Sequence, residues 1–169
     1  MTIVHQAQRV GIFIDVQNMY HSAKALYEQN VNFAKIIEHA TNNRQLVRAM
    51  AYVIKSENGK EQQFFEALEK IGIELQAKDV QVFASGQKKG DWDVGMAVDA
   101  IKIAHRLDVV VLVTGDGDFC PLVNYLRENK GCKVEGIAFG RSTSAKLIET
   151  LDQFTDLDKD PRHFLIRVG

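Results

Sequence analysis

The feature that most constrains the fold of this chain is an uninterrupted apolar run that ends in acids. Residues 109–113 are five apolar residues in succession, four of them β-branched, which is typical of a strand buried on both faces in a parallel sheet. Asp116 and Asp118 follow, and Gly115 and Gly117 are expected to let the backbone turn sharply there. Ligands of open α/β sheets bind outside the carboxyl ends of the strands. This pair of acids therefore predicts a metal site.

Strand patterns alternate with helix patterns along the rest of the chain. Further strands are predicted at 10–15, 47–54, 73–76, 80–84 and 133–139, and helices at 19–28, 33–40, 59–71, 93–104, 119–130 and 145–151. A last strand is suggested within 156–169. This alternation predicts a single α/β domain over 1–169, with helices on both faces of a mostly parallel sheet.

Composition narrows the class of protein. The chain has 169 residues, 46% hydrophobic and 25% charged, which is ordinary globular composition. No apolar run approaches the roughly 20 residues of a membrane-spanning helix, so no membrane association is expected. Cys120 and Cys132 have no metal-ligand or redox spacing, which predicts reduced thiols in the cytoplasm. The net charge of −1 argues against a protein that binds the phosphate backbone of duplex DNA. Bound metal ions could still bring nucleic acid to an acidic site.

Acids stand at the ends of several predicted elements. Asp15 directly follows the apolar run at 10–14, and Asp93 lies at the start of a helix. If the first and central strands are neighbours where the strand order reverses, their carboxyl ends share one crevice with Asp116. Crowded carboxylates repel one another unless a cation neutralises them. Oxygen ligands alone suit Mg²⁺ or Mn²⁺ rather than zinc, and such an ion can assist hydrolysis of a phosphodiester.

Several of these residues have a simpler structural explanation. Asp118 could be the N-cap of the helix that follows it, and Asp91 or Asp93 could cap the helix that they open. Asn18 could cap the first helix instead of contacting substrate. The lysines at 88–89 could be solvated loop residues instead of phosphate contacts.

Other known motifs do not fit the chain. The Gly115–Gly117 segment begins like a dinucleotide fingerprint, but Cys120 occupies the last glycine position and two acids would face the pyrophosphate. A Walker-type phosphate loop, a metalloprotease histidine pair and a nucleophile-elbow serine are absent from the sequence. A phosphatase of the haloacid-dehalogenase kind would need a second acid where Gln17 stands.

Together the motifs resemble the NYN domain, a branch of the PIN-like metal-dependent ribonucleases, and within it the LabA-like group. The residues that carry the resemblance are Asp15 with Asn18, Lys89-Gly90 followed by Asp93 and Asp99, and the run from Thr114 to Phe119. The resemblance covers roughly residues 10–157. It implies a three-layer, Rossmann-like PIN-like fold with the strand order 3-2-1-4-5.

The resemblance also implies a site and a reaction. One or two Mg²⁺ or Mn²⁺ ions would be held by four acids, namely Asp15, Asp93, Asp116 and Asp118. The resemblance places four further residues near substrate, namely Asn18, Lys89, Thr114 and Ser144, with Asp99 behind the ligands or as an additional pocket acid. Family members have one residue fewer after the glycine of the Lys-Gly element, so Asp91 stays an alternative to Asp93.

The implied reaction is endonucleolytic hydrolysis of RNA, with a single-stranded substrate favoured. The alternative is a regulatory module of the LabA-like type that binds nucleotide or nucleic acid at the same pocket and cleaves little. Homo-oligomerisation is left open.

Overall fold

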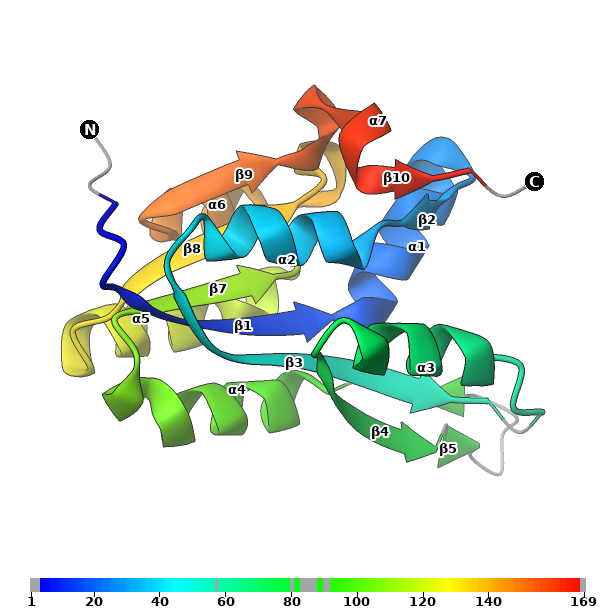
Figure 1. The fold of residues 1–169 in the computed structure, drawn as a ribbon, viewed down its shortest axis with the longest axis horizontal. Coiled ribbons are helices and arrows are strands. Elements are labelled where there is room, and N and C mark those ends of the chain that lie inside the picture. Colours follow the sequence, from blue (N-terminus) through cyan, green and yellow to red (C-terminus); the bar gives the residue numbers. More distant parts are fainter. Residues whose placement is uncertain (1–3, 57, 80, 83–87, 90–91, 168–169) are drawn as a thin grey trace.

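A central sheet of parallel strands organises the fold in the computed structural model, which describes residues 4–56, 58–79, 81–82, 88–89 and 92–167 (Figure 1). Within these residues the sheet has six strands, and each pairs with its neighbours in parallel. Their spatial order is β4 (Glu74–Asp79), β3 (Gln45–Lys55), β1 (Arg9–Asp15), β7 (Val109–Val113), β8 (Lys133–Ala138) and β9 (Gln153–Asp156).

Counted along the chain, the strands of this sheet run 3-2-1-4-5-6. The predicted α/β class and the first five positions are right, but the predicted order lacked the sixth strand, β9. β9 is only four residues long and half-buried, with none of the continuous apolar character of β7. The order reverses between β1 and β7, where Ile14 pairs with Val113. The residues that follow these two strands therefore emerge side by side.

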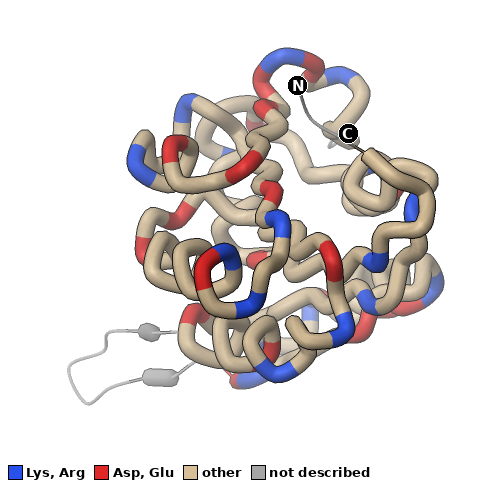
Figure 2. Tube along the Cα trace, turned by 90° about the vertical axis from the view of Figure 1, so that its left-hand side faces the viewer, with Lys and Arg blue, Asp and Glu red and all other residues tan. Residues whose placement is uncertain are grey.

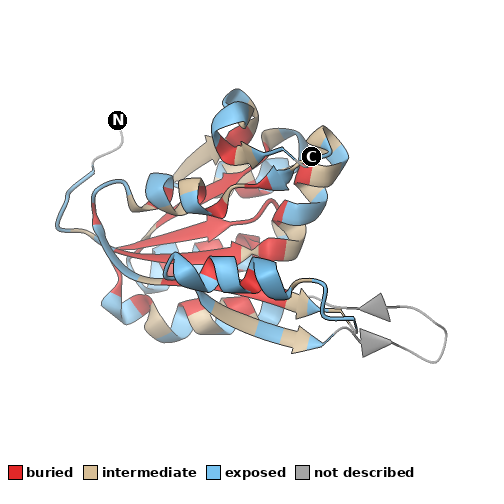
Figure 3. Cartoon of the chain, turned by 45° about the vertical axis from the view of Figure 1, so that its right-hand side comes forward, coloured by how far each residue is buried: buried red, intermediate tan, exposed pale blue. Residues whose placement is uncertain are grey.

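Helices cover both faces of the sheet. Neighbouring side chains of each strand point to opposite faces, and buried apolar side chains lie on both of them. Ile12 and Ile14 of β1 pack in a core with α1 (Val16–Tyr27), α2 (Phe33–Thr41) and α3 (Gln62–Lys70). Phe13 packs in the other core with α4 (Asp93–Ile103), α5 (Cys120–Asn129) and α6 (Ala145–Thr150). All residues of β7 are buried between these layers, as the apolar run predicted (Figure 3).

The shorter elements differ more from the sequence-based expectation. The suggested strand within 156–169 is confined to β10 (Leu165–Ile166), which pairs antiparallel with β2 (Asn30–Val31). The chain before β10 forms η4 (Leu157–Lys159) and α7 (Pro161–Phe164), since proline favours the first turn of a helix.

The strand predicted at 80–84 lies partly outside the described residues. Its described part, β5 (Gln81–Val82), pairs with β6 (Lys88–Lys89) instead of joining the main sheet. The remaining 3₁₀ turns are η1 (Ala104–Arg106), η2 (Gly117–Phe119) and η3 (Gly140–Ser142).

Charged residues of both signs are interspersed along the described trace (Figure 2). This distribution agrees with the net charge of −1. None of the described helices has the length and apolar character needed to cross a membrane.

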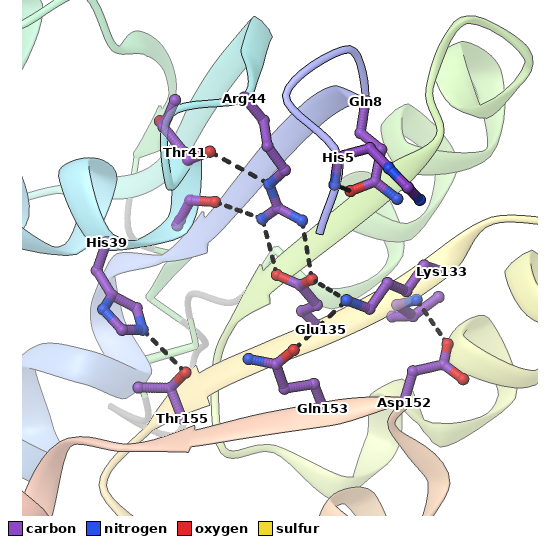
Figure 4. A network of polar contacts seen from close by, with 12 residues as sticks. His5, Gln8, His39, Thr41, Arg44, Lys133, Glu135, Asp152, Gln153 and Thr155 are labelled. Carbon is purple, nitrogen blue, oxygen red and sulfur yellow. Dashed lines mark hydrogen bonds and ion pairs between the residues drawn. The ribbon is translucent and has the colours of Figure 1, made fainter. Parts of the chain in front are cut away.

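A buried ion pair joins the two halves of the sheet away from its carboxyl end (Figure 4). The Arg44 guanidinium, just before β3, donates two hydrogen bonds of 3.0 Å to the carboxylate of Glu135 in β8. Arg44 also donates to the carbonyl oxygens of Ala40 and Thr41, so it satisfies the end of α2. Burial alone would raise the pKa of Glu135, but hydrogen bonds from Arg44 and Lys133 hold that pKa below its usual value.

Candidate metal centre

Asp15 links the end of β1 to the start of α1. Its Oδ1 accepts a hydrogen bond of 3.2 Å from the backbone N–H of Asn18, which makes Asp15 the N-cap of α1. Asn18 is therefore not the cap. Its side-chain oxygen instead accepts a 2.9 Å hydrogen bond from the N–H of Gly115, beyond the end of β7. The first predicted strand and the central strand are thus connected at their carboxyl ends.

The turn after β7 is organised by Thr114 and Asp116. Thr114 is 1% exposed. Its hydroxyl donates to Asp15 Oδ2 at 3.1 Å and accepts from the N–H of Asp116 at 3.2 Å. Asp116 Oδ1 accepts a 2.9 Å hydrogen bond from the N–H of Asp118 and so caps η2. The capping role considered for Asp118 is not observed: the N-cap of α5 is Phe119, which makes no side-chain capping hydrogen bond, and Asp118 itself is exposed.

The two glycines of this turn are needed for close approach and not for an unusual backbone conformation. The positive φ angles of the described chain do not include Gly115 or Gly117. A Cβ at Gly115 would lie 2.8 Å from Thr143 Oγ1, and one at Gly117 would lie 2.7 Å from Ser144 Oγ. The expectation that these glycines permit a sharp turn is therefore corrected: they make room for the 143–144 segment. The N–H of Ser144 also donates to the carbonyl oxygen of Gly115 at 3.0 Å.

Asp93 reaches the same region from the first residue of α4, and Trp92 anchors that helix start. The indole N–H of Trp92 donates to the carbonyl oxygen of Val53 in β3 at 2.9 Å. The ring meets Tyr52 edge-on at a centroid distance of 5.5 Å. A Cβ at Gly95 would lie 2.5 Å from the Trp92 ring, so glycine allows the first turn of α4 to close over the indole.

Three carboxylates converge at the carboxyl end of the sheet. Asp15, Asp93 and Asp116 each offer an oxygen within 4.8 Å of the others, and all three are partly buried. We call these residues the acidic cluster; it is the only such group of histidines, cysteines and acids within the described part of the chain. Mg²⁺ ligands lie about 2.1 Å from the ion, so two of them are separated by about 3–4 Å. Small side-chain rotations would suffice for these oxygens to share one cation.

The other predicted site residues lie outside this cluster. Asp118 is exposed, and Asp99 accepts a 2.8 Å hydrogen bond from the Tyr52 hydroxyl. Burial and the Asp99 carboxylate both raise the pKa of Tyr52, so its hydroxyl stays protonated. The backbone of Lys89 in β6 pairs with Gln81 in β5, but the Lys89 side chain and Asp91 fall outside the described residues.

Ser144 lies beside the 115–117 turn that carries Asp116, close to Gly117, and it also caps α6. Its Oγ accepts a 3.4 Å hydrogen bond from the N–H of Leu147.

Trp92 is the functional candidate that sequence reasoning did not identify. Its position immediately before Asp93, with a glycine three residues later, was the available signal. Its role depends on Val53, a residue far away in the chain. That contact has no signature in the local pattern.

Comparisons with known proteins agree with the fold and with the family suggested by the motifs. The family model of the NYN domain matches residues 9–158, which confirms the resemblance found in the motifs. The low amplitude and bright protein LabA of Synechococcus elongatus is 24% identical over 168 residues, which cover 93% of this chain and 87% of LabA. A crystal structure of a protein of unknown function from Vibrio parahaemolyticus superposes with a TM-score of 0.87 at 36% identity, covering 98% of this chain and 100% of that one.

Proposed function

The chain belongs to the NYN domain family, and from that membership we propose that it is a metal-dependent endoribonuclease. Its acidic cluster would bind Mg²⁺ or Mn²⁺, and its substrate would be single-stranded RNA. The observation that supports this proposal most strongly is the convergence of Asp15, Asp93 and Asp116 from separate elements on one point. Carboxylates that are crowded in this way repel one another, and a divalent cation would stabilise them.

Each residue around the cluster would have a distinct task. A divalent cation held by the three carboxylates would offset the charge that develops on the phosphate and would favour deprotonation of the attacking water. The buried Thr114 hydroxyl orients Asp15 and the backbone of Asp116. The amide NH₂ of Asn18 and the ammonium of Lys89 would contact the phosphate, and Ser144 would close the side of the site near Gly117. Asp118 would act at the exposed edge of the site. Asp99 would act indirectly, through the hydrogen bond that it accepts from Tyr52.

The decisive experiment measures RNA cleavage and Mn²⁺ binding on the same variants. The wild-type protein should cleave a labelled single-stranded RNA with Mg²⁺ or Mn²⁺ and lose this activity with EDTA. Asp116→Asn should reduce both cleavage and Mn²⁺ affinity by about 100-fold or more, since it removes a charged ligand. Asp118→Asn, the matched control two residues away, should reduce Mn²⁺ affinity much less. Cleavage that is equally fast in EDTA, or with Asp116→Asn, would exclude the mechanism.

A second candidate function is a regulatory module that binds RNA or nucleotide and cleaves little. It is favoured by the exposure of Asp118, which leaves three acids at the cluster where four were expected, and by the similarity to LabA. Intact Mn²⁺ and RNA binding without cleavage of any RNA tested would support this function over the nuclease.

A cytoplasmic location is proposed for either function. Cys120 and Cys132 are both free and buried, which supports the reducing environment expected from their spacing.

A further inference from the structure

We propose that the exposed side of α1 is a binding strip for single-stranded RNA, centred on Tyr20. The strip consists of Tyr20, His21 and Lys24, and we call it the Tyr20 strip. This inference rests on the proposed function and adds the path that the substrate takes beyond the acidic cluster.

The Tyr20 strip lies next to the acidic cluster because Asp15 caps the helix that carries it. Tyr20 is five residues after Asp15, about 7.5 Å further along the axis of α1. The remaining sides of this part of α1 are already in use. Met19 and Ala23 are buried, while Asn18 and Ser22 bond to Gly115 and Ser142. The exposed side is therefore the open surface that leads away from the site along α1.

The side chains of the strip are suited to nucleotides. Tyr20 is 48% exposed although it is a large aromatic residue. The His21 ring meets it edge-on at 5.6 Å, and Lys24 Nζ lies 5.7 Å from the centre of the Tyr20 ring. An exposed aromatic ring can stack on a base of any sequence, and a neighbouring lysine can contact the phosphate of the strand. A protein with a net charge of −1 gains affinity for RNA from such a local site, not from its overall charge.

The charge along the helix supports the same occupant. The residues of α1 include no Asp or Glu, so an anionic strand would meet no carboxylate between the cap Asp15 and the end of the helix. Single-stranded RNA fits better than a duplex, since the bases of a duplex are stacked on each other and cannot stack on Tyr20.

The chain contains a matched control for Tyr20. Tyr125 in α5 is 38% exposed and has Lys130 Nζ 5.9 Å from the centre of its ring. It carries the same aromatic–lysine pairing, but α5 packs on the opposite face of the sheet from α1. A general effect of removing a surface tyrosine would therefore appear in both variants.

The test measures binding of a fluorescein-labelled single-stranded RNA of roughly 12 nucleotides by fluorescence anisotropy. Ca²⁺ replaces Mg²⁺ so that the RNA stays intact, which gel electrophoresis verifies. Tyr20→Ala should weaken RNA binding by about five-fold or more, because the stacking of one base is lost. Tyr20→Phe, which keeps the ring, should bind like the wild type, and so should Tyr125→Ala. Lys24→Ala should weaken RNA binding. The slope of log affinity against log salt concentration should also fall by about 1, because one phosphate contact is lost.

The result separates this inference from the proposed function. RNA binding that is equally tight in Tyr20→Ala and the wild type would overturn the Tyr20 strip and leave the nuclease proposal standing. Failure of the wild type to bind RNA, with Mn²⁺ affinity intact, would overturn the choice of RNA as substrate and the strip with it. Calorimetric titration with Mn²⁺ checks that Tyr20→Ala keeps a folded acidic cluster.

Discussion

At the scale of single residues, Thr114 is the side chain that connects two members of the acidic cluster. Its hydroxyl proton is directed at Asp15 Oδ2, which leaves an oxygen lone pair for the N–H of Asp116. Since Thr114 is 1% exposed, water cannot readily replace either bond. Outer groups of this kind set the orientation of metal ligands.

Replacing Thr114 tests this role directly. Thr114→Val keeps the shape of the side chain but removes the hydroxyl, so Mn²⁺ affinity should fall by about 10-fold. Thr114→Ser keeps the hydroxyl and should restore most of that affinity. Both affinities can be measured by isothermal titration calorimetry. Equal Mn²⁺ affinity in Thr114→Val and the wild type would show that the hydroxyl does not orient the ligands.

At the scale of elements, the acidic cluster depends on how the start of α4 is held against the sheet. Asp15 and Asp116 follow neighbouring strands and are connected through Thr114, whereas Asp93 belongs to a helix. Trp92 anchors that helix through its hydrogen bond to Val53 and its packing against Gly95. The residue immediately before Asp93 is therefore held against the sheet.

Trp92 also provides a spectroscopic signal, because it is the only tryptophan in the sequence. Paramagnetic Mn²⁺ bound at the neighbouring Asp93 should quench Trp92 fluorescence in a saturable way. Asp93→Asn should remove the saturable quenching and leave only weak collisional quenching. A wild-type titration curve identical to that of Asp93→Asn would contradict binding of the ion at Asp93.

Trp92→Phe separates the hydrogen bond to Val53 from the packing of the ring. The variant keeps an aromatic side chain but loses the indole N–H, which costs about 1 kcal/mol of stability. If the anchor positions Asp93, Mn²⁺ affinity should fall by several-fold in calorimetry, and adding Asp93→Asn should weaken binding no more than Asp93→Asn alone. Independent, additive losses would show that Trp92 acts on stability alone.

At the scale of the whole molecule, the buried Arg44–Glu135 ion pair and the acidic cluster lie in different parts of the sheet. The Arg44–Glu135 pair lies before β3 and early in β8, while the acidic cluster follows the ends of β1 and β7. The side chains of this pair are 1% and 10% exposed. Removing one partner would leave a buried charge without its counter-charge.

Glu135→Gln should therefore lower the free energy of unfolding by about 3 kcal/mol, because the charge of Arg44 stays buried. Mn²⁺ affinity should be unchanged, since the pair is remote from the cluster. Urea denaturation followed by circular dichroism measures the first quantity, and calorimetry measures the second. A loss of less than about 1 kcal/mol would show that water reaches Arg44 in the variant.

The pair should also make stability depend on pH in the acidic range. The pKa of Glu135 is held below its unfolded value of about 4.5. Its stabilisation is thus present above pH 4.5 and is lost as the pH falls through the lower folded pKa. The stability difference between the wild type and Glu135→Gln should shrink below pH 4.5, as measured by urea denaturation across pH. A difference that stays constant down to pH 3 would argue against this linkage.

Metal binding should appear as a change in stability of the whole domain. The acidic cluster gathers charge only in the folded chain, so Mn²⁺ at about 100 times its Kd should stabilise the fold by about 2.7 kcal/mol. The expected result is a higher Tm with Mn²⁺ in the wild type but not in Asp116→Asn, measured by differential scanning fluorimetry. An equal rise in both proteins would point to Mn²⁺ binding elsewhere.

The sequence alone determined the local structure and the elements that carry the acids. The apolar run at 109–113 predicted β7 because a strand between two helical layers needs no polar side. The run before Asp15 predicted β1 in the same way, and the motif spacing led to the NYN family. These features depend on neighbouring residues, so periodicity and spacing are sufficient to find them.

Only the tertiary structure decided which acids meet. Asp118 is two residues from Asp116, yet Asp116 caps η2 and Asp118 is exposed, whereas Asp93 joins the cluster from a different helix. The sixth strand, the contact of Gly117 with Ser144 and the anchoring of Trp92 on Val53 also depend on segments far apart in the chain. Convergence of this kind depends on which elements pack against one another, and that choice leaves no periodic trace in the sequence.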